Sequence, residues 1–151
     1  ALEYYRQTGE KLSVHNARER EKQSPYNFLY YVVNTDRELL YKRIEQRVDK
    51  MMEDGLVDEV RSLKEEGAKR GMTSMQGLGY KEILDYLEGI TTLDEAVYIL
   101  KRDTRHFAKR QLTWFRREKD VRWLYLPEFE NDLNKVTEKI LADCRDQRII
   151  R

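Results

Sequence analysis

The sequence contains almost none of the residues that cross-link a chain or anchor it in a membrane. Its only cysteine, Cys144, cannot form an internal disulfide or provide a zinc site by itself. No apolar run approaches the roughly 18 residues that a membrane-spanning helix needs, and the first residues do not have the pattern of a signal peptide. We therefore expect a soluble protein of a reducing compartment, with a cytoplasmic location.

An excess of one charge is also absent, because 29 Lys and Arg stand against 28 Asp and Glu, for a net charge of +1. The chain as a whole therefore does not indicate a polyanion partner, and any such partner must be inferred from where the charges lie. We expect little disorder, since 40% of the residues are apolar and ten Tyr, four Phe and two Trp can each bury a large area. A length of 151 residues suits one domain or part of a larger one.

Several catalytic motifs are missing too. The sequence has no GxxxxGK[ST] phosphate loop, no GxSxG elbow, no HExxH and no cysteine pair. Its two histidines, His15 and His106, lie 91 residues apart, and neither has an obvious triad setting. Residue patterns of these kinds therefore identify no catalytic centre.

Two segments have the composition of strands. Residues 26–33 are apolar at nearly every position, which suits a strand of a parallel sheet buried on both faces, and residues 122–126 offer a second strand. Two strands do not make a stable sheet by themselves. Either helices cover the pair, or the rest of the sheet lies outside this chain.

Apolar spacing and helix-end signals predict a helix-dominated α/β fold with one or two strands and about six helices. Residues 10–25 and 68–79 are expected to be loops. Capping-box spacing occurs at Thr35–Glu38 and at Thr92–Glu95. The expected helices are residues 1–6 (closed by Gly9), 35–54, 56–66, 80–87, 93–117 and 131–147. Helix 35–54 has the apolar stripe Leu40, Ile44, Val48, Met51 and Met52, and helix 131–147 is expected to point Leu133, Val136, Ile140 and Leu141 inward.

Positive charge is concentrated in residues 101–117, which contain seven Lys and Arg and a single Asp. On an ideal helix, one arc of about 80° holds a set that we call the cationic ridge: Arg102, Arg105, Lys109, Thr113 and Arg116. The opposite side holds Leu93, Ala96, Val97, Leu100, Phe107 and Phe115. Such a ridge suits a polyanion, because each neutralised phosphate releases counterions. The alternative is a solvated face whose cations pair with acidic residues of neighbouring helices.

Three further features bear on a nucleic-acid partner. The block from Lys109 to Arg116 mixes cations, an amide, a hydroxyl and a ring, which suits unstacked bases and phosphates. Taken by itself, Trp114 is more typical of a residue buried in the protein core. Gln111 lies midway round the apolar face of the helix, so its amide needs a buried partner or a ligand. Glycines before the helix at Tyr80 permit close backbone approach and phosphate binding, although a tight turn is the alternative.

Arg47 lies at the edge of the apolar stripe of its predicted helix. An arginine at such a position can bury its stem and direct its guanidinium at an anion. A surface arginine paired with a nearby carboxylate fits the spacing equally well.

Four blocks taken together resemble the bacterial tRNA dimethylallyltransferase (tRNA isopentenyltransferase) family, from Ala1 to about Leu126. These blocks are Ala1–Glu3 with Thr8–Gly9, Arg43–Val48, Gly77–Glu82 and Lys109–Arg116. The resemblance implies transfer of a dimethylallyl group from dimethylallyl diphosphate to N6 of adenosine 37 in tRNA. It also implies Mg²⁺ in the full-length enzyme, with ligands outside this chain.

The resemblance assigns roles by position. It implies that Arg47 stabilises the departing diphosphate. It implies contacts to the tRNA anticodon stem-loop from Gln76, Gly77, Leu78, Gly79, Tyr80, Lys81, Lys109, Arg110, Gln111, Thr113, Trp114 and Arg116. The cationic ridge adds Arg102 and Arg105 as predicted tRNA contacts.

In the resembling family, the phosphate loop and the general-base aspartate belong to an N-terminal half that this chain lacks. We therefore expect residues 1–126 to be the C-terminal part of a P-loop-type α/β core, followed by a C-terminal helix in 127–151. The chain alone is expected to be inactive. The zinc finger of eukaryotic members is absent, which favours a bacterial protein. A non-catalytic helical RNA-binding module and a purely structural helical domain are the alternatives.

Overall fold

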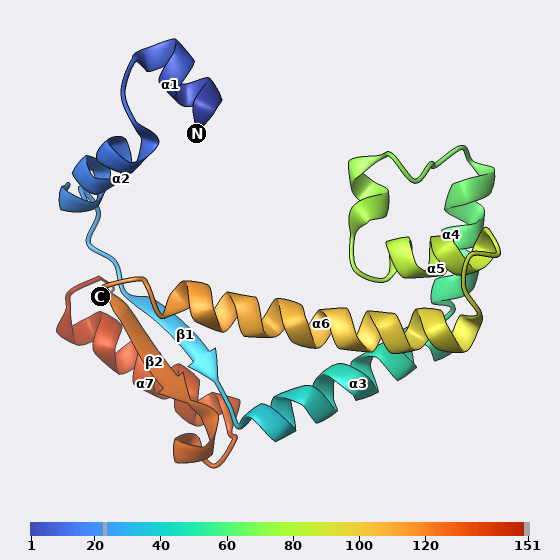
Figure 1. Ribbon diagram of the computed structural model, residues 1–151. Helices are drawn as coiled ribbons and strands as arrows, with labels where there is room; N and C mark the ends of the chain where they lie inside the picture. Colours follow the sequence, from blue (N-terminus) through green and yellow to red (C-terminus); the bar gives the residue numbers. More distant parts are fainter. Residues whose placement is uncertain (23, 150–151) are drawn as a thin grey trace. The chain divides into compact units, whose positions relative to one another are not determined.

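The computed structural model describes residues 1–22 and 24–149, apart from the side chain of Arg20. The chain divides into two compact units, Ala1–Leu29 with Ile140–Arg151 and Tyr30–Lys139 (Figure 1). Gln23, in the expected loop 10–25, and the last two residues of the expected C-terminal segment lie outside the described residues. Over the described ranges, no helix combines the length and the apolar character needed to cross a membrane.

The larger unit contains a parallel pair of strands, β1 (Tyr30–Asn34) and β2 (Val121–Tyr125). The parallel pairing is confirmed, and Asn34 lies opposite Tyr125 at the carboxyl ends. Residues 26–29 were expected to belong to the first strand but lie outside it. Burial on both faces is also wrong, because Val33 is 48% exposed while Val32 is 7% exposed. Within the described part of the chain the sheet has only two strands.

The predicted helices follow β1 in the predicted order, and they are α3 (Arg37–Glu53), α4 (Leu56–Glu65), α5 (Tyr80–Leu87) and α6 (Leu93–Phe115). The loop expected over residues 68–79 is wrong where the short 3₁₀ helix η1 (Thr73–Gln76) forms. Figure 1 shows α4 and α5 gathered at one end of the long helices α3 and α6. Their apolar faces meet in a core made of Val48, Leu56, Val60, Met75, Ile83, Leu84, Ala96 and Leu100. The predicted stripe of α3 is confirmed, since Val48 is buried and Met51 and Met52 pack against this core.

The two predicted capping boxes have different outcomes. At α6, the Glu95 N–H donates to Thr92 Oγ1 (3.3 Å) and the Thr92 N–H donates to Glu95 Oε2 (2.8 Å), which confirms the box. The box at Thr35 is wrong, because α3 starts one residue later with Asp36 as its N-cap. The Asp36 carboxylate accepts a hydrogen bond from the Tyr125 hydroxyl instead of capping the helix.

After β2 the chain forms a 3₁₀ turn, η2 (Leu126–Phe129), and then α7 (Leu133–Asp146). Val136 is buried in α7, as its spacing predicts. Leu133 is 65% exposed and Leu141 is 38% exposed, so the inward direction predicted for these two residues is wrong.

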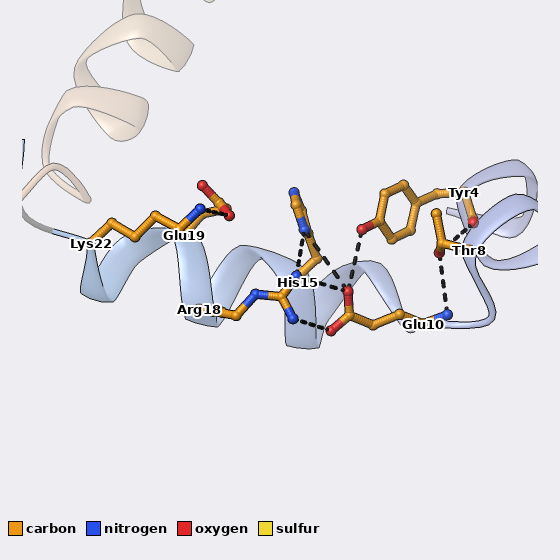
Figure 2. A network of polar contacts seen from close by, with 7 residues as sticks. All are labelled: Tyr4, Thr8, Glu10, His15, Arg18, Glu19 and Lys22. Atoms are coloured by element: carbon orange, nitrogen blue, oxygen red, sulfur yellow. Dashed lines mark hydrogen bonds and ion pairs between the residues drawn. The ribbon is translucent and has the colours of Figure 1, made fainter.

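The smaller unit contains α1 (Leu2–Thr8), which ends at Gly9 as predicted, and α2 (Leu12–Glu21). The loop expected over residues 10–25 is therefore wrong where α2 forms. Neither glycine nor proline interrupts residues 10–24, and side-chain ion pairs can support a helix that is polar all round. Figure 2 shows such pairs: the Arg18 guanidinium donates to both oxygens of Glu10 (2.9 and 3.2 Å), and Lys22 pairs with Glu19 (2.6 Å).

Candidate nucleic-acid interface

The cations of α6 fall into two groups, and the N-terminal group is paired with acidic residues. Lys101 Nζ lies 2.5 Å from an Asp49 oxygen, and Arg105 Nη1 lies 2.6 Å from Glu45 Oε1, both partners belonging to α3. Arg102 pairs with the adjacent Asp103 at 2.8 Å, and this guanidinium holds the pKa of the Asp103 carboxyl below its usual value. The alternative, in which cations pair with acidic residues of a neighbouring helix, therefore holds for Lys101 and Arg105, whereas Arg102 pairs within α6.

The C-terminal group has no such partners. Lys109, Arg110, Arg116 and Arg117 are exposed, and none of them forms an ion pair with any residue that the structure describes. The Arg110 guanidinium instead lies over the Phe107 ring, 5.9 Å from its centroid. Positive charge without counter-charge is therefore concentrated at the last two turns of α6 and just beyond its end.

A surface hollow of about 470 Å³ lies along these turns. It is lined by His106, Lys109, Arg110, Thr113, Trp114 and Arg117. His106 and Arg117 were not among the predicted site residues, although His106 lies three and four residues before Lys109 and Arg110 and so shares their helix face. The hollow combines several cations with an aromatic ring and a hydroxyl.

The aromatic residues of α6 are placed differently from the prediction. Trp114 is 54% exposed, so the interpretation of this residue as core is wrong. Phe115 holds the inner position instead, with its ring edge-on to Tyr30 (6.2 Å between centroids) and to Trp114 (5.3 Å). Phe107, expected on the anchored side, is 45% exposed. Gln111 is exposed as well and lines a smaller hollow of about 240 Å³, so of its two predicted partners, a buried group or a ligand, the ligand stays a prediction.

The segment from Gln76 to Lys81 is held in place by polar contacts. The Gln76 side-chain amide donates to the Arg70 carbonyl, and the Arg70 guanidinium pairs with Glu88 (2.6 Å) and Asp85 (2.5 Å), which raises the pKa of Arg70. At the other end, the Tyr80 hydroxyl donates to Glu59, a contact that raises the pKa of Tyr80. These contacts leave Gly77, Leu78 and Lys81 facing solvent.

Gly79 has a backbone geometry that favours glycine. Its φ is +103°, and its N–H donates to Glu82 Oε2 at 2.9 Å. Glu82 is only 2% exposed, so this hydrogen bond is an interior one. The predicted close-approach glycine therefore starts α5 with a turn that a side chain would strain.

Arg47 lies on the exposed surface of α3. It forms neither an ion pair nor a hydrogen bond with any other described side chain, so pairing with a nearby carboxylate is not observed. Its guanidinium is available to an external anion.

Metal-binding groups do not converge in the part of the chain that the structure describes. Among residues 1–22 and 24–149, no three His, Cys, Asp or Glu side chains lie close enough together to hold a metal ion. Cys144 is a free thiol. The carboxylate oxygens that Mg²⁺ prefers are therefore not gathered at one place here.

Comparison with known proteins gives matches over most of the chain. The family model described as IPP transferase matches residues 1–118. A tRNA dimethylallyltransferase of Lachnoclostridium phytofermentans is 57% identical over 145 residues, covering 95% of this chain and 46% of that protein. One from Carboxydothermus hydrogenoformans is 52% identical, covering 95% and 45%. The chain thus spans about half the length of the curated relatives that it matches.

Solved structures agree with these matches. The tRNA isopentenylpyrophosphate transferase of Bacillus halodurans superimposes with a TM-score of 0.74 at 39% identity, covering 87% of this chain and 44% of that one. The tRNA delta(2)-isopentenylpyrophosphate transferase of Staphylococcus epidermidis gives a TM-score of 0.77 at 36% identity, covering 97% and 47%. The fold described above is therefore one already seen in experimental structures.

Proposed function

Because this chain belongs to the IPP transferase family, we propose that it acts as part of a tRNA dimethylallyltransferase. The reaction transfers a dimethylallyl group from dimethylallyl diphosphate to N6 of adenosine 37 of tRNA. The new bond joins N6 to the prenyl carbon, the carbon–oxygen bond to the diphosphate breaks, and N6 loses a proton. A cytoplasmic location fits a tRNA substrate.

The observation that carries this proposal is the unpaired positive charge at the C-terminal end of α6. Lys109, Arg110, Arg116 and Arg117 have no acidic partner among the described residues, and three of them, Lys109, Arg110 and Arg117, line one hollow with the exposed Trp114. Cations of this kind fix a stem-loop through its phosphates, while an exposed ring stacks on loop bases. The target adenine must leave the anticodon-loop stack before its amine can reach the prenyl carbon. An exposed ring beside the cations suits an opened loop.

Arg47 is assigned to the diphosphate. Negative charge grows on the diphosphate as its bond to carbon breaks, and a guanidinium placed there stabilises the transition state. The described residues offer no carboxylate cluster for Mg²⁺. Any Mg²⁺ in the reaction is therefore assigned to other parts of the protein, as are the phosphate loop and the general base.

The direct test compares this chain with the full-length product of its gene. We expect the 151-residue chain to bind an anticodon stem-loop in a salt-dependent way but to transfer no prenyl group. The full-length protein should form prenylated adenosine, detected by mass spectrometry of digested tRNA. Transfer by the short chain alone would contradict the assignment of the phosphate loop and base to other segments. RNA binding without transfer by either protein would favour the non-catalytic RNA-binding module.

The role of Arg47 has its own test in the full-length protein. Arg47→Ala should raise the transition-state free energy by about 2–4 kcal/mol, measured as kcat/KM for dimethylallyl diphosphate. Lys50→Ala on the same helix removes a cation already paired with Asp54 (3.1 Å) and serves as the matched control. Equal small effects from both changes would contradict the assignment.

A further inference from the structure

His106 is a titratable side chain to which the proposed function gives no role. It is exposed on α6, and it lines the hollow of about 470 Å³ together with Trp114 and three unpaired cations, Lys109, Arg110 and Arg117. It forms neither a hydrogen bond nor an ion pair with any residue that the structure describes. No described group therefore occupies its two ring nitrogens.

The position of His106 on α6 places it at one end of the polar lining of the hollow. Residues three and four positions apart on a helix are neighbours on one face. Arg110 follows His106 by four residues, and Thr113 follows Arg110 by three. These three side chains therefore form one row, about 10 Å long at the rise of an α-helix. An RNA strand that lies along the row contacts the imidazole as well as the unpaired cations.

The charges around His106 determine how its protonation state responds to an anion. Asp103, three residues before it, is engaged by Arg102 at 2.8 Å. The pKa of Asp103 is lowered first by Arg102 and to smaller extents by His106 and by Lys81 of α5, so these side chains lie within electrostatic range of the carboxylate. The other charged neighbours are the cations of the hollow, Lys109, Arg110 and Arg117. In the free protein, cations therefore outnumber carboxylates around the imidazole.

A phosphate in the hollow reverses this balance. Its negative charge offsets the cations and favours an imidazolium, which donates from both ring nitrogens. Histidine is the side chain that ordinarily changes charge between about pH 5 and 8. The RNA complex therefore binds more protons than the free protein in this range. By linkage, RNA affinity rises as the pH falls, and the gain is lost as the pH rises.

We propose that His106 contacts an RNA phosphate only when its imidazole is protonated, so that the hollow binds RNA more tightly at about pH 6 than at about pH 8. The inference rests on the RNA partner of the proposed function, and it does not depend on prenyl transfer. An exposed ion pair contributes modestly, so the expected gain in affinity is about fivefold. One additional phosphate contact should also make the slope of log affinity against log salt steeper by about 0.7 at the lower pH.

The test measures the anisotropy of a labelled anticodon stem-loop bound to the 151-residue chain, at about pH 6 and about pH 8 and over a series of salt concentrations. The original chain should show the gain in affinity and the steeper slope at the lower pH. His106→Gln should bind at both pH values as the original chain does at the higher one. His106→Lys keeps a positive charge throughout, so it should bind at both pH values as the original chain does at the lower one.

His15 provides the matched control, because the sequence contains only these two histidines. It belongs to the smaller unit, where its Nδ1 lies 4.0 Å from Glu10 Oε2 and 3.4 Å from Arg18 Nη2 (Figure 2). His15→Gln should therefore retain the pH dependence of the original chain. Loss of that dependence in His15→Gln and its retention in His106→Gln would overturn the inference.

The remaining outcomes separate the inference from the proposed function. A weakening by His106→Gln that is equal at both pH values would overturn the inference, because a neutral imidazole would then make the contact. Affinity of the original chain that is independent of pH, with prenyl transfer by the full-length protein, would overturn the inference while the proposed function stands. Binding that strengthens in acid through His106, without transfer by the full-length protein, would support the inference and count against the proposed function.

Discussion

Replacing Arg116 with glutamine should flatten the salt dependence of RNA binding, whereas the same change at Arg105 should leave the slope unchanged. Each phosphate neutralised on a single strand contributes about 0.7 to the slope of log affinity against log salt, so four unpaired cations give a slope of about −2.8. Affinity would then fall about 50-fold between roughly 50 and 200 mM salt. Engagement of all seven cations in residues 101–117 would give a slope of about −4.9 and a fall of about 900-fold.

The contrast between the two arginines rests on their partners. The Arg105 guanidinium lies 2.6 Å from Glu45, and its side chain is only 23% exposed, so its charge is already neutralised within the protein. The cationic ridge placed Arg105 among the predicted tRNA contacts, and its pairing with Glu45 leads us to expect a small contribution from it. Arg116 is exposed and unpaired among the described residues, so its loss should reduce the slope by about 0.7.

The assay is fluorescence anisotropy of a labelled anticodon stem-loop at a series of KCl concentrations. A double variant, Arg105→Gln with Glu45→Gln, controls for the carboxylate that the single change at Arg105 leaves uncompensated. Lys101→Gln, whose lysine pairs with Asp49, is a second control that should keep the original slope. Equal reductions in slope for Arg105→Gln and Arg116→Gln would refute the division of α6 into a paired and an unpaired group.

Three further predictions concern single residues. Trp114→Ala should weaken stem-loop binding by about 1–3 kcal/mol if its exposed ring stacks on a base, and unchanged anisotropy titrations would contradict stacking. Gly79→Ala should destabilise the fold by about 1–2 kcal/mol in urea unfolding because its φ is +103°, while Gly77→Ala, at φ −63° and with neighbours no closer than 3.7 Å, should cost less. Hydrogen bonds from the Thr92 N–H and hydroxyl lower the pKa of the Glu95 carboxyl in the folded protein. The ionised carboxylate therefore stabilises the fold at pH values above the unfolded pKa, and this contribution is lost as the pH falls through the lower folded pKa. Glu95→Gln should therefore lower Tm at neutral pH, with the difference shrinking in acid; a constant difference would contradict the linkage.

The two threonines with capping-box spacing show how far local sequence predicts structure. Thr92 and Thr35 are each followed three residues later by glutamate. Only Thr92 forms the box, because α3 begins at Arg37 with Asp36 as its N-cap. The carboxylate of Asp36 is bound by Tyr125, a residue 89 positions away. A contact of that separation has no local signal, so the spacing alone could not decide between the two outcomes.

Helix ends and apolar stripes were predictable for a physical reason. The glycines at positions 9, 55, 67, 79 and 89 all have positive φ, which few other residues adopt at low cost. Apolar periodicity located α3 to α6 because burial of one face stabilises those helices. The helix α2 has no such face, so a method that depends on apolar periodicity could not find it. The exposed position of Trp114 was missed because Phe115, its neighbour, occupies the inner position.

The division of the α6 cations depends on the register between two helices. Lys101 and Arg105 lie one turn apart on α6, and their partners Asp49 and Glu45 lie one turn apart on α3. The pairs run in opposite order along the two helices, as expected where neighbouring helices run antiparallel. Each partly exposed pair stabilises the fold by at most about 1 kcal/mol, so the larger consequence is electrostatic. The charges of Lys101 and Arg105 are balanced by α3, and that of Arg102 by Asp103 of α6 itself. The surface that remains for an anion is therefore the last two turns of α6 and the residues just beyond its end.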